Sequence, residues 1–275
     1  MERNSNMKVL KLKIYQPQAH YRIPFTYQIR HTYPIPPYST IIGFLCNVLG
    51  IRNYRNEGEP CENQNCNCDY HNLKKIKISI SGKFESKTTE YTWFRNLSKD
   101  SHNSRFSIPE NRYISGHIEH IGGQMPVSID ILNDVKLWIY IYHEEGEFLE
   151  KIKQSIENPQ NRIYPLHLGR AEDWILIEKL ELIEVKETDI GGNFKKFTWI
   201  PKGLYQKENL NFNFEKIEGI LYKLTTFYSL KNGIRDFEYI DVKLNEGEIP
   251  ALKWAIKFYL DEEENTPIFL ADLGG

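Results

Sequence analysis

The stretch RHTYPIPPYSTIIGFLCNVLGI, from Arg30 to Ile51, places three prolines directly before an uncharged, largely apolar run. A residue that precedes proline is driven towards an extended backbone, so the chain is expected to stay extended up to Pro37. A helix then begins either with Pro37 as its first residue or with Ser39 as its N-cap. It is expected to end near Leu49, because Gly50 can adopt the left-handed conformation that stops a helix.

Two different stripes run along this expected helix. Ile41, Leu45 and Val48 share an apolar face, which predicts burial against a core. A second stripe consists of small residues, namely Gly43, Cys46, Asn47 and Gly50. Because a glycine inside a helix costs about 1 kcal/mol relative to alanine, the stripe indicates the close approach of another backbone. That backbone is either a sheet or a ligand strand, and packing on a sheet is the favoured interpretation.

The segments around this helix alternate strand and helix patterns. Residues 7–15 and 74–84 alternate apolar and polar side chains, as half-buried strands do. After a long excursion, residues 134–143 predict a strand, residues 146–159 a helix and residues 174–185 another strand. The order is therefore β-α-β, an excursion, and β-α-β. With antiparallel pairing it predicts an α+β, ferredoxin-like fold, which is also the plan of the RNA recognition motif (RRM-like).

The same patterns divide the chain into two parts. The expected ferredoxin-like domain covers residues 1–186, with a Cys- and Asn-rich insertion at 51–73. Beyond it, residues 187–275 contain mostly strand patterns and predict a smaller, mostly-β C-terminal subdomain.

Composition narrows the possible partners. The 275 residues are 40% hydrophobic and 26% charged, which suffices for a sizeable core. The net charge is only −2, but residues 1–126 carry seven more basic than acidic residues and the remainder carries nine more acidic ones. This asymmetry reflects either solvated faces or a first half that meets a polyanion. No apolar run is long enough to span a bilayer and the N-terminus has no apolar signal region, so we expect a cytoplasmic protein without membrane contact.

Three of the four cysteines lie within eight residues. Cys61, Cys66, Cys68 and His71 have the spacing C-x4-C-x-C-x2-H. Cysteines form stable disulfides in oxidising compartments, so in a cytoplasmic protein we expect these to be free thiols or metal ligands. Cysteine thiolates together with a histidine imidazole suit tetrahedral zinc. The spacing differs from the usual C-x2-C pair, so the alternative is a flexible insertion with incidental thiols. No cofactor is otherwise required, and structural zinc is the one metal that this pattern suggests.

Three further features could contact RNA. The segment 74–112 holds nine Lys/Arg against four Asp/Glu, with aromatic residues between them. Such a mixture either neutralises phosphates and stacks on bases or forms an ordinary hairpin with solvated cations. Tyr113, His117 and His120 could instead form a metal-independent ribonuclease site, although surface histidines are commoner. Arg170, after the turn former Gly169, either pairs with its acidic neighbours or reaches a phosphate. Common nucleotide-binding and hydrolase motifs are absent from the sequence.

Two motifs carry a resemblance to a known family. The opening stretch follows the first strand with an aromatic-Pro, Pro-Pro, Ser/Thr and Gly-helix pattern, and YPLHLGRAED at 164–173 precedes the last expected strand of the first domain. Both resemble the fifth CRISPR-associated (Cas) family. Members of this family are RAMP-type subunits of type I Cascade complexes, and an I-B-like complex is one example. The opening covers residues 7–51, and residues 187–275 add little to the match. The cysteine cluster departs from the family pattern.

The resemblance implies a ferredoxin-like RAMP domain with an inserted β-hairpin thumb, which would correspond to residues 87–126. It implies a subunit that grips the 5′ handle of CRISPR RNA and contacts the backbone subunit and the large subunit of Cascade, with target DNA met only indirectly. One branch of the family cuts precursor RNA with a Tyr, Lys and His trio, which has no clear counterpart here, so no catalytic residue is assigned. The expected RNA contacts are Arg22, Arg30, His31, Tyr33, Lys87, Arg95, Lys99, Arg105, Arg112, His117, His120 and Arg170.

Three functions therefore remain in view. The first is a non-catalytic RNA-binding subunit in antiviral defence. The second is a metal-independent endoribonuclease that processes precursor CRISPR RNA on the same fold. The third is a zinc-stabilised module that binds another protein.

Overall fold

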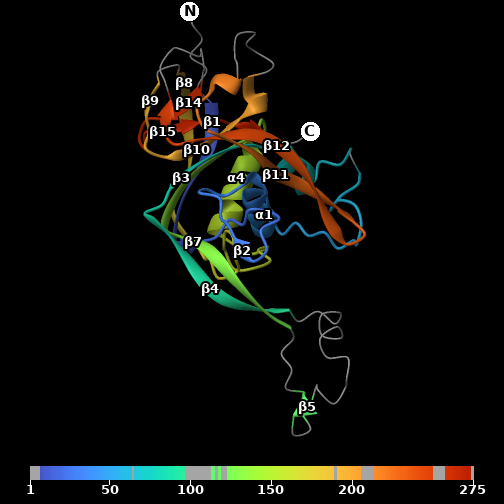
Figure 1. Cartoon of the computed structure of the whole chain (residues 1–275). Helices are drawn as coiled ribbons and strands as arrows, with labels where there is room; N and C mark the ends of the chain where they lie inside the picture. The colour runs from blue at the N-terminus through green and yellow to red at the C-terminus, as the bar shows by residue number, and fades with distance from the viewer. Residues whose placement is uncertain are drawn as a thin grey trace, which may run out of the picture.

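The computed structural model describes residues 7–63, 65–96, 113–114, 117–118, 123–188, 191–205, 214–249 and 258–273. Over these ranges the protein is mostly β with few helices, arranged around one large, mainly antiparallel sheet (Figure 1). The predicted α+β class is confirmed. Within the described ranges, no helix combines the length and the apolar character that crossing a membrane requires.

Four strands form the middle of the sheet. They are β1 (Met7–Ala19), β3 (Lys77–Lys83), β7 (Gly123–Tyr142) and β8 (Leu176–Thr188). Their order is β3-β7-β1-β8, and each neighbouring pair is antiparallel. The centre of β1 is buried on both faces: Leu10 and Leu12 join the main core, while Val9 joins a smaller cluster with Trp138 and Tyr140.

Two helices complete the main core. α1 (Tyr38–Leu49) follows β1, and α4 (Gly146–Glu157) follows β7. Their apolar residues, for example Ile41 and Leu45 of α1 and Phe148 and Ile152 of α4, pack into the same buried cluster as β1. The two helices lie near each other beside the sheet (Figure 1). Along the chain, α1 therefore lies between β1 and β3, and α4 lies between β7 and β8.

The ends of α1 follow the proline and glycine signals. Pro37, with an extended backbone, is the N-cap, and Ser39 makes no capping bond because its hydroxyl lies 2.6 Å from that of Thr225. Gly50 ends the helix at φ 74°. The expected packing of the small stripe on a sheet is wrong at Gly43, because a Cβ there would have no heavy atom within 4 Å. Gly43 faces open space instead, whereas at the far end of the stripe Asn47 accepts hydrogen bonds from the amides of Ile163 and Tyr164, and a Cβ at Gly50 would lie 2.9 Å from the carbonyl oxygen of Asn161.

The strands after β8 extend both edges of the sheet. β10 (Phe197–Pro201) pairs with β3, and β14 (Phe258–Asp261) pairs with β8. The predicted domain boundary between residues 186 and 187 stays a prediction. It lies within β8, and the sheet continues past it because β8 pairs with β14. The other elements on these edges are β11 (Ile220–Lys231), β12 (Ile234–Asn245), β15 (Thr266–Ile268), β16 (Ala271–Asp272), η2 (Lys202–Tyr205) and η3 (Phe214–Lys216). Short pieces are α2 (Asp69–Lys74), β2 (Ile29–Arg30), β5 (Tyr113–Ile114), β6 (His117–Ile118), β9 (Gly192–Asn193) and β13 (Glu248–Ile249).

A two-stranded ribbon leaves the body of the molecule. β4 (Ser86–Asn96) pairs antiparallel with the first half of β7, from Ser86 opposite Asn133 to Asn96 opposite Gly123. Figure 1 shows this β4–β7 ribbon projecting away from the helices. The second half of β7 pairs with β3, so one continuous strand belongs to both the ribbon and the core. Asp134, at the junction, has the left-handed φ of 54°.

Candidate nucleic-acid interface

A wide groove opens beside the N-terminus of α1. Its volume is about 810 Å³, and it is lined by segments of the loop after β1, β2, the 169–172 turn and β12. Four arginines line it together with three aromatic residues besides the buried Tyr21, and we call the site they form the arginine groove: Arg22, Arg30, Arg170 and Arg235 with Phe25, Phe237 and Tyr239. Among the described residues that line it, Glu172 is the one acidic side chain.

Arg22 and Arg30 lie on two arms of one tight loop. A bridge joins Arg22 to Thr32, and the amide of Ile23 donates to the carbonyl of His31 at 2.9 Å. The Arg22 guanidinium donates to the carbonyl of Thr26 at 2.8 Å. Burial, and then the positive charge of Arg22, lower the pKa of Arg30. Two cations held this close favour an anion between them, since it would relieve their repulsion.

Arg170 is positioned by a turn that requires glycine. Gly169 has φ 96°, and a Cβ there would lie 2.6 Å from the carbonyl oxygen of His20. The buried carboxylate of Asp173 accepts hydrogen bonds from the Arg170 side chain, the shortest from Nη2 at 2.6 Å. Burial alone would lower the pKa of Arg170, but this carboxylate raises it. Of the two roles expected for Arg170, pairing with Asp173 is present, and its place in the groove leaves phosphate contact open.

Phe25 is unusual in both exposure and backbone. Its ring is 81% exposed, and its φ is 63°, a left-handed value that costs a non-glycine residue about 1–2 kcal/mol. Neither property stabilises the folded chain. An exposed aromatic ring on a strained backbone is typical of a residue retained for binding.

β12 supplies the opposite wall. Arg235, Phe237 and Tyr239 are alternate residues, so they share one face of the strand. The guanidinium carbon of Arg235 lies 4.8 Å from the ring centre of Tyr228, and Tyr239 is 49% exposed. None of these residues was expected as an RNA contact from the sequence. The alternating pattern of IRDFEYI indicated that these three residues share one face of a strand. Nothing in the sequence placed that face beside Arg22.

Asp130 pairs with two of the expected RNA contacts. His31 Nδ1 lies 2.9 Å from its carboxylate, Lys87 Nζ lies 3.4 Å away, and the hydroxyl of Thr89 donates at 3.0 Å. Burial alone would raise the pKa of Asp130, but the hydrogen bonds from His31 and Thr89 and the charge of Lys87 hold it below its ordinary value. His31 and Lys87 thus share a negative partner at the root of the β4–β7 ribbon.

We expect Asp130→Asn to lower the free energy of unfolding at neutral pH by about 1–2 kcal/mol, because charge-assisted hydrogen bonds become neutral ones. The folded-state pKa is depressed, so this contribution is present above the ordinary pKa near 3.8 and is lost as pH falls through the lower, folded value. Urea titrations from neutral to acidic pH should show the gap between wild type and variant closing. Asp134→Asn is the matched control, and a gap that stays constant with pH would contradict the assignment.

Tyr33 is not available to RNA, which corrects the expectation from the sequence. It is only 5% exposed, and its ring packs edge-on against Trp199 and Tyr222. The indole N–H of Trp199 donates to the carbonyl of Pro36 at 2.9 Å. The aromatic-proline segment therefore serves the core between α1 and the sheet edge.

The remaining expected contacts lie along the ribbon and beyond it. Arg95 is on β4 opposite Gln124, and His117 is on β6 opposite Ile114. The other expected contacts in this part of the chain, Lys99, Arg105, Arg112 and His120, lie outside the described residues. The alternative ribonuclease site predicted from Tyr113, His117 and His120 falls in the same part of the chain and stays a prediction.

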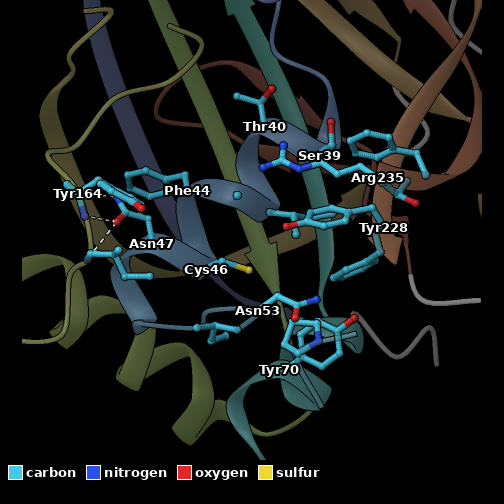
Figure 2. Close-up of a pocket in the computed structure, with 18 of the residues that line it drawn as sticks. Ser39, Thr40, Phe44, Cys46, Asn47, Asn53, Tyr70, Tyr164, Tyr228 and Arg235 are labelled. Carbon is cyan, nitrogen blue, oxygen red and sulfur yellow. Dashed lines mark hydrogen bonds between the residues drawn. The ribbon is translucent and has the colours of Figure 1, made fainter. Parts of the chain in front are cut away.

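A second groove, of about 440 Å³, continues along α1 from the first (Figure 2). Gly43, Cys46 and Asn47 of the small stripe form part of its floor. The two grooves share Ser39, Thr40, Gly169, Arg235 and Phe237. Absence of a side chain at Gly43 thus opens a path along the helix rather than bringing a strand closer.

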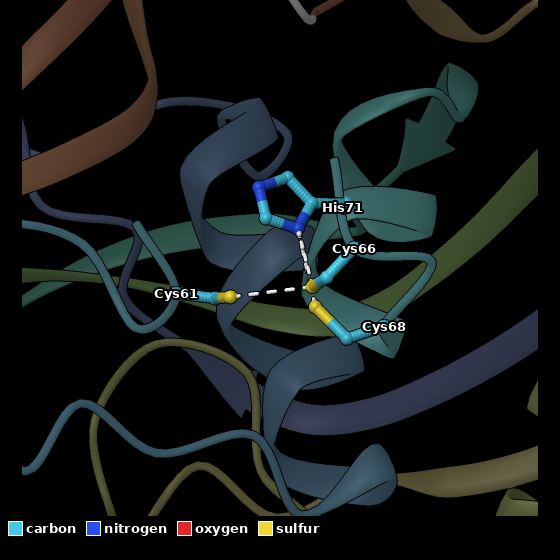
Figure 3. Close-up of side chains that lie close together, drawn as sticks. All are labelled: Cys61, Cys66, Cys68 and His71. Atoms are coloured by element: carbon cyan, nitrogen blue, oxygen red, sulfur yellow. Dashed lines mark hydrogen bonds between the residues drawn. The ribbon is translucent and has the colours of Figure 1, made fainter. Parts of the chain in front are cut away.

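The four predicted metal ligands lie together (Figure 3). Their ligand atoms all fall within 4.8 Å of one another. Cys61 Sγ is 3.4 Å from Cys66 Sγ, and His71 Nδ1 lies 3.3 Å from Cys66 Sγ and 3.2 Å from Cys68 Sγ. The fourth cysteine, Cys46, is on α1 and outside the cluster.

Comparison with known proteins agrees with the sequence resemblance. The model of the family described as CRISPR-associated protein (Cas_Cas5) matches residues 9–243. This chain therefore belongs to the Cas5 family of CRISPR-associated proteins, as the opening motif predicted.

Solved structures show the likeness of fold. A chain of a CRISPR RNA-guided surveillance complex is 14% identical, with a TM-score of 0.51 over 90% of this chain and 92% of that chain. A crystal structure of a CRISPR protein from Archaeoglobus fulgidus is 11% identical, with a TM-score of 0.42 over 96% and 100% of the two chains. No curated protein matches significantly.

Proposed function

We propose that this Cas5-family protein is a non-catalytic RNA-binding subunit of a type I Cascade complex, which acts in the cytoplasm in antiviral defence and grips the 5′ handle of CRISPR RNA. The observation that carries the proposal is the arginine groove, where four guanidinium groups line one cavity together with Phe25, Phe237 and Tyr239. Membership of the Cas5 family and the fold shared with a chain of an RNA-guided surveillance complex support it.

In this proposal, the β1–α1–β3 and β7–α4–β8 halves form a ferredoxin-like platform, and the β4–β7 ribbon is the base of the thumb. The arginine groove lies beside the ribbon root, where β2 pairs with β7 at Ile129. The handle would run past both. Cascade backbone and large subunits are the proposed protein partners, and target DNA would be met only through them.

The groove would bind RNA by two complementary interactions. Guanidinium groups neutralise phosphates and release counterions, which makes affinity depend on salt. Exposed rings stack on unpaired bases, and this is worth about 1–3 kcal/mol per base. Phe25 and Tyr239 combine exposure with proximity to arginines, so a single strand could place its backbone on one set and its bases on the other.

We expect the double variant Arg22→Ala/Arg235→Ala to bind handle RNA more weakly and to reduce the slope of log affinity against log salt by about 1.4, because each phosphate contact on a single strand contributes about 0.7. Fluorescence anisotropy of a labelled repeat-derived RNA, titrated at several salt concentrations, measures both quantities. Lys186→Ala removes an exposed cation of β8 outside the groove and is the control.

An unchanged slope in the double variant would contradict the proposal. The same RNA incubated in EDTA tests the second function: a discrete cut at the handle would favour the metal-independent endoribonuclease.

A further inference from the structure

The Cys/His cluster, Cys61, Cys66, Cys68 and His71, has the dimensions of a tetrahedral metal site. Zinc–sulfur and zinc–nitrogen bonds of about 2.3 and 2.0 Å place the three sulfurs and one nitrogen of a tetrahedron roughly 3.5–3.8 Å apart. The closest distances here, 3.2 to 3.4 Å, are a few tenths of an ångström shorter, and all four ligand atoms lie within 4.8 Å of one another, so small side-chain rotations would bring them onto a tetrahedron. Figure 3 shows the four side chains converging on one point from a loop and from α2.

Local backbone geometry explains the convergence. Cys68 is the extended N-cap of α2, and His71 lies three residues later on the same side of its first turn. A turn that includes the hydrogen bond from the amide of Cys66 to the carbonyl of Asn63, at 3.0 Å, brings Cys66 back towards the helix. The ligand spacing that looked irregular in the sequence is therefore compatible with a closed set of four.

We propose that the Cys/His cluster holds one Zn²⁺ as a structural Cys3His site. Three thiolates and one neutral imidazole supply four ligands, which leaves no open position for a substrate. The proposal does not depend on RNA binding, since it rests only on these four side chains.

The place of the cluster in the chain indicates what the metal does. The insertion at 51–73 docks on the turn between β11 and β12, where Gly58 and Leu230 exchange backbone hydrogen bonds of 2.8 and 2.9 Å. The loop from Cys61 to His71 begins three residues later, and Tyr70 and Leu73 of α2 are buried. Zinc closes this loop between the two attachment points.

The insertion that carries the closed loop lines part of the second groove. Asn53, Pro60 and Tyr70 come from the insertion, and Tyr70 belongs to the closed loop itself. Figure 2 shows Asn53 and Tyr70 together with Tyr228 and Arg235 of the β11–β12 hairpin. Loops of this length without regular structure are uncommon in compact domains unless something anchors them. The zinc site supplies that anchor and holds the insertion in place against the β11–β12 hairpin.

The test begins with the metal content of the full-length protein, purified without chelator and measured by inductively coupled plasma mass spectrometry. About one zinc per chain is expected. Cobalt substitution should give the visible bands of a tetrahedral thiolate site. Cys66→Ser should lose zinc affinity by more than the roughly 10- to 100-fold that follows loss of a side chain that only orients a ligand. Cys46→Ala, which removes the cysteine outside the cluster, should retain the metal.

His71→Cys keeps the proposal falsifiable if Cys66→Ser does not fold, because it replaces one zinc ligand by another and should still bind zinc. Hydrogen exchange of the insertion should accelerate in the wild type when a chelator removes the metal. Absence of zinc after reconstitution under reducing conditions would overturn the proposal. So would a Cys61–Cys66 disulfide in freshly purified protein, or iron in place of zinc.

Discussion

Replacing Asp173 with alanine should lower the free energy of unfolding by about 3–5 kcal/mol, which is the usual cost of removing one partner of a buried ion pair. Asp173 is 2% exposed. Its Oδ2 accepts the backbone amides of His20 and Arg170, both at 2.9 Å, and the Arg170 side chain binds the same carboxylate. The variant would leave two amides and a guanidinium without their acceptor. Urea denaturation monitored by circular dichroism measures the loss.

Glu172→Ala is the matched control for this variant. Glu172 is 65% exposed and lies 3.5 Å from Arg170, so its loss should cost less than about 1 kcal/mol. The two neighbouring carboxylates differ mainly in burial. Similar effects of the two substitutions would show that the Asp173 network contributes little, and that the 169–172 wall of the groove is held by other contacts.

The double variant Phe25→Gly/Tyr239→Ala should weaken handle RNA binding by about 3 kcal/mol or more, a factor of roughly 150, if each ring stacks on one base. Stability should change little or rise, because glycine adopts the left-handed backbone of residue 25 without strain. Opposite effects on binding and stability are the signature of a residue kept for function. Anisotropy titrations and urea denaturation of the same samples measure the two quantities.

Tyr54→Ala is the control for nonspecific loss of aromatic surface. Tyr54 is 82% exposed and lies outside both grooves. RNA affinity that falls equally in the control and in the double variant would contradict the assignment of the rings. Affinity unchanged in the double variant would leave the arginines as the only RNA contacts of the groove.

Local signals predicted much of the fold. Gly50 ends α1 as expected, and the helix begins at Tyr38, one residue after the predicted first position Pro37, which is its N-cap. The alternation in residues 7–15 indicated β1, which continues to Ala19. Gly169 was expected to permit a tight turn, and it does. Each of these features depends on a few neighbouring residues, which is why the sequence alone could indicate them.

The site was harder to predict because it joins distant segments. Arg22 and Arg170 were expected as RNA contacts, but Arg235 and Tyr239 reach the same groove only through the pairing of β11, β12 and β10 at the sheet edge. The prediction that Tyr33 contacts RNA was wrong for a related reason. Its partners Trp199 and Tyr222 are far away in sequence, so nothing local distinguished a core ring from a surface one.

The backbone conformation at Asp134 bears on the direction in which the β4–β7 ribbon leaves the sheet. Along one edge of β7, the partner changes from β3 to β4 across this residue, whose φ is 54°. A β-branched residue there could hardly keep this φ. A substitution that excludes this φ would therefore have to redirect the outer part of the ribbon against the hold of β1, which pairs with β7 on both sides of Asp134, at Asn133 and Val135, while the pairings inside the ribbon stayed intact.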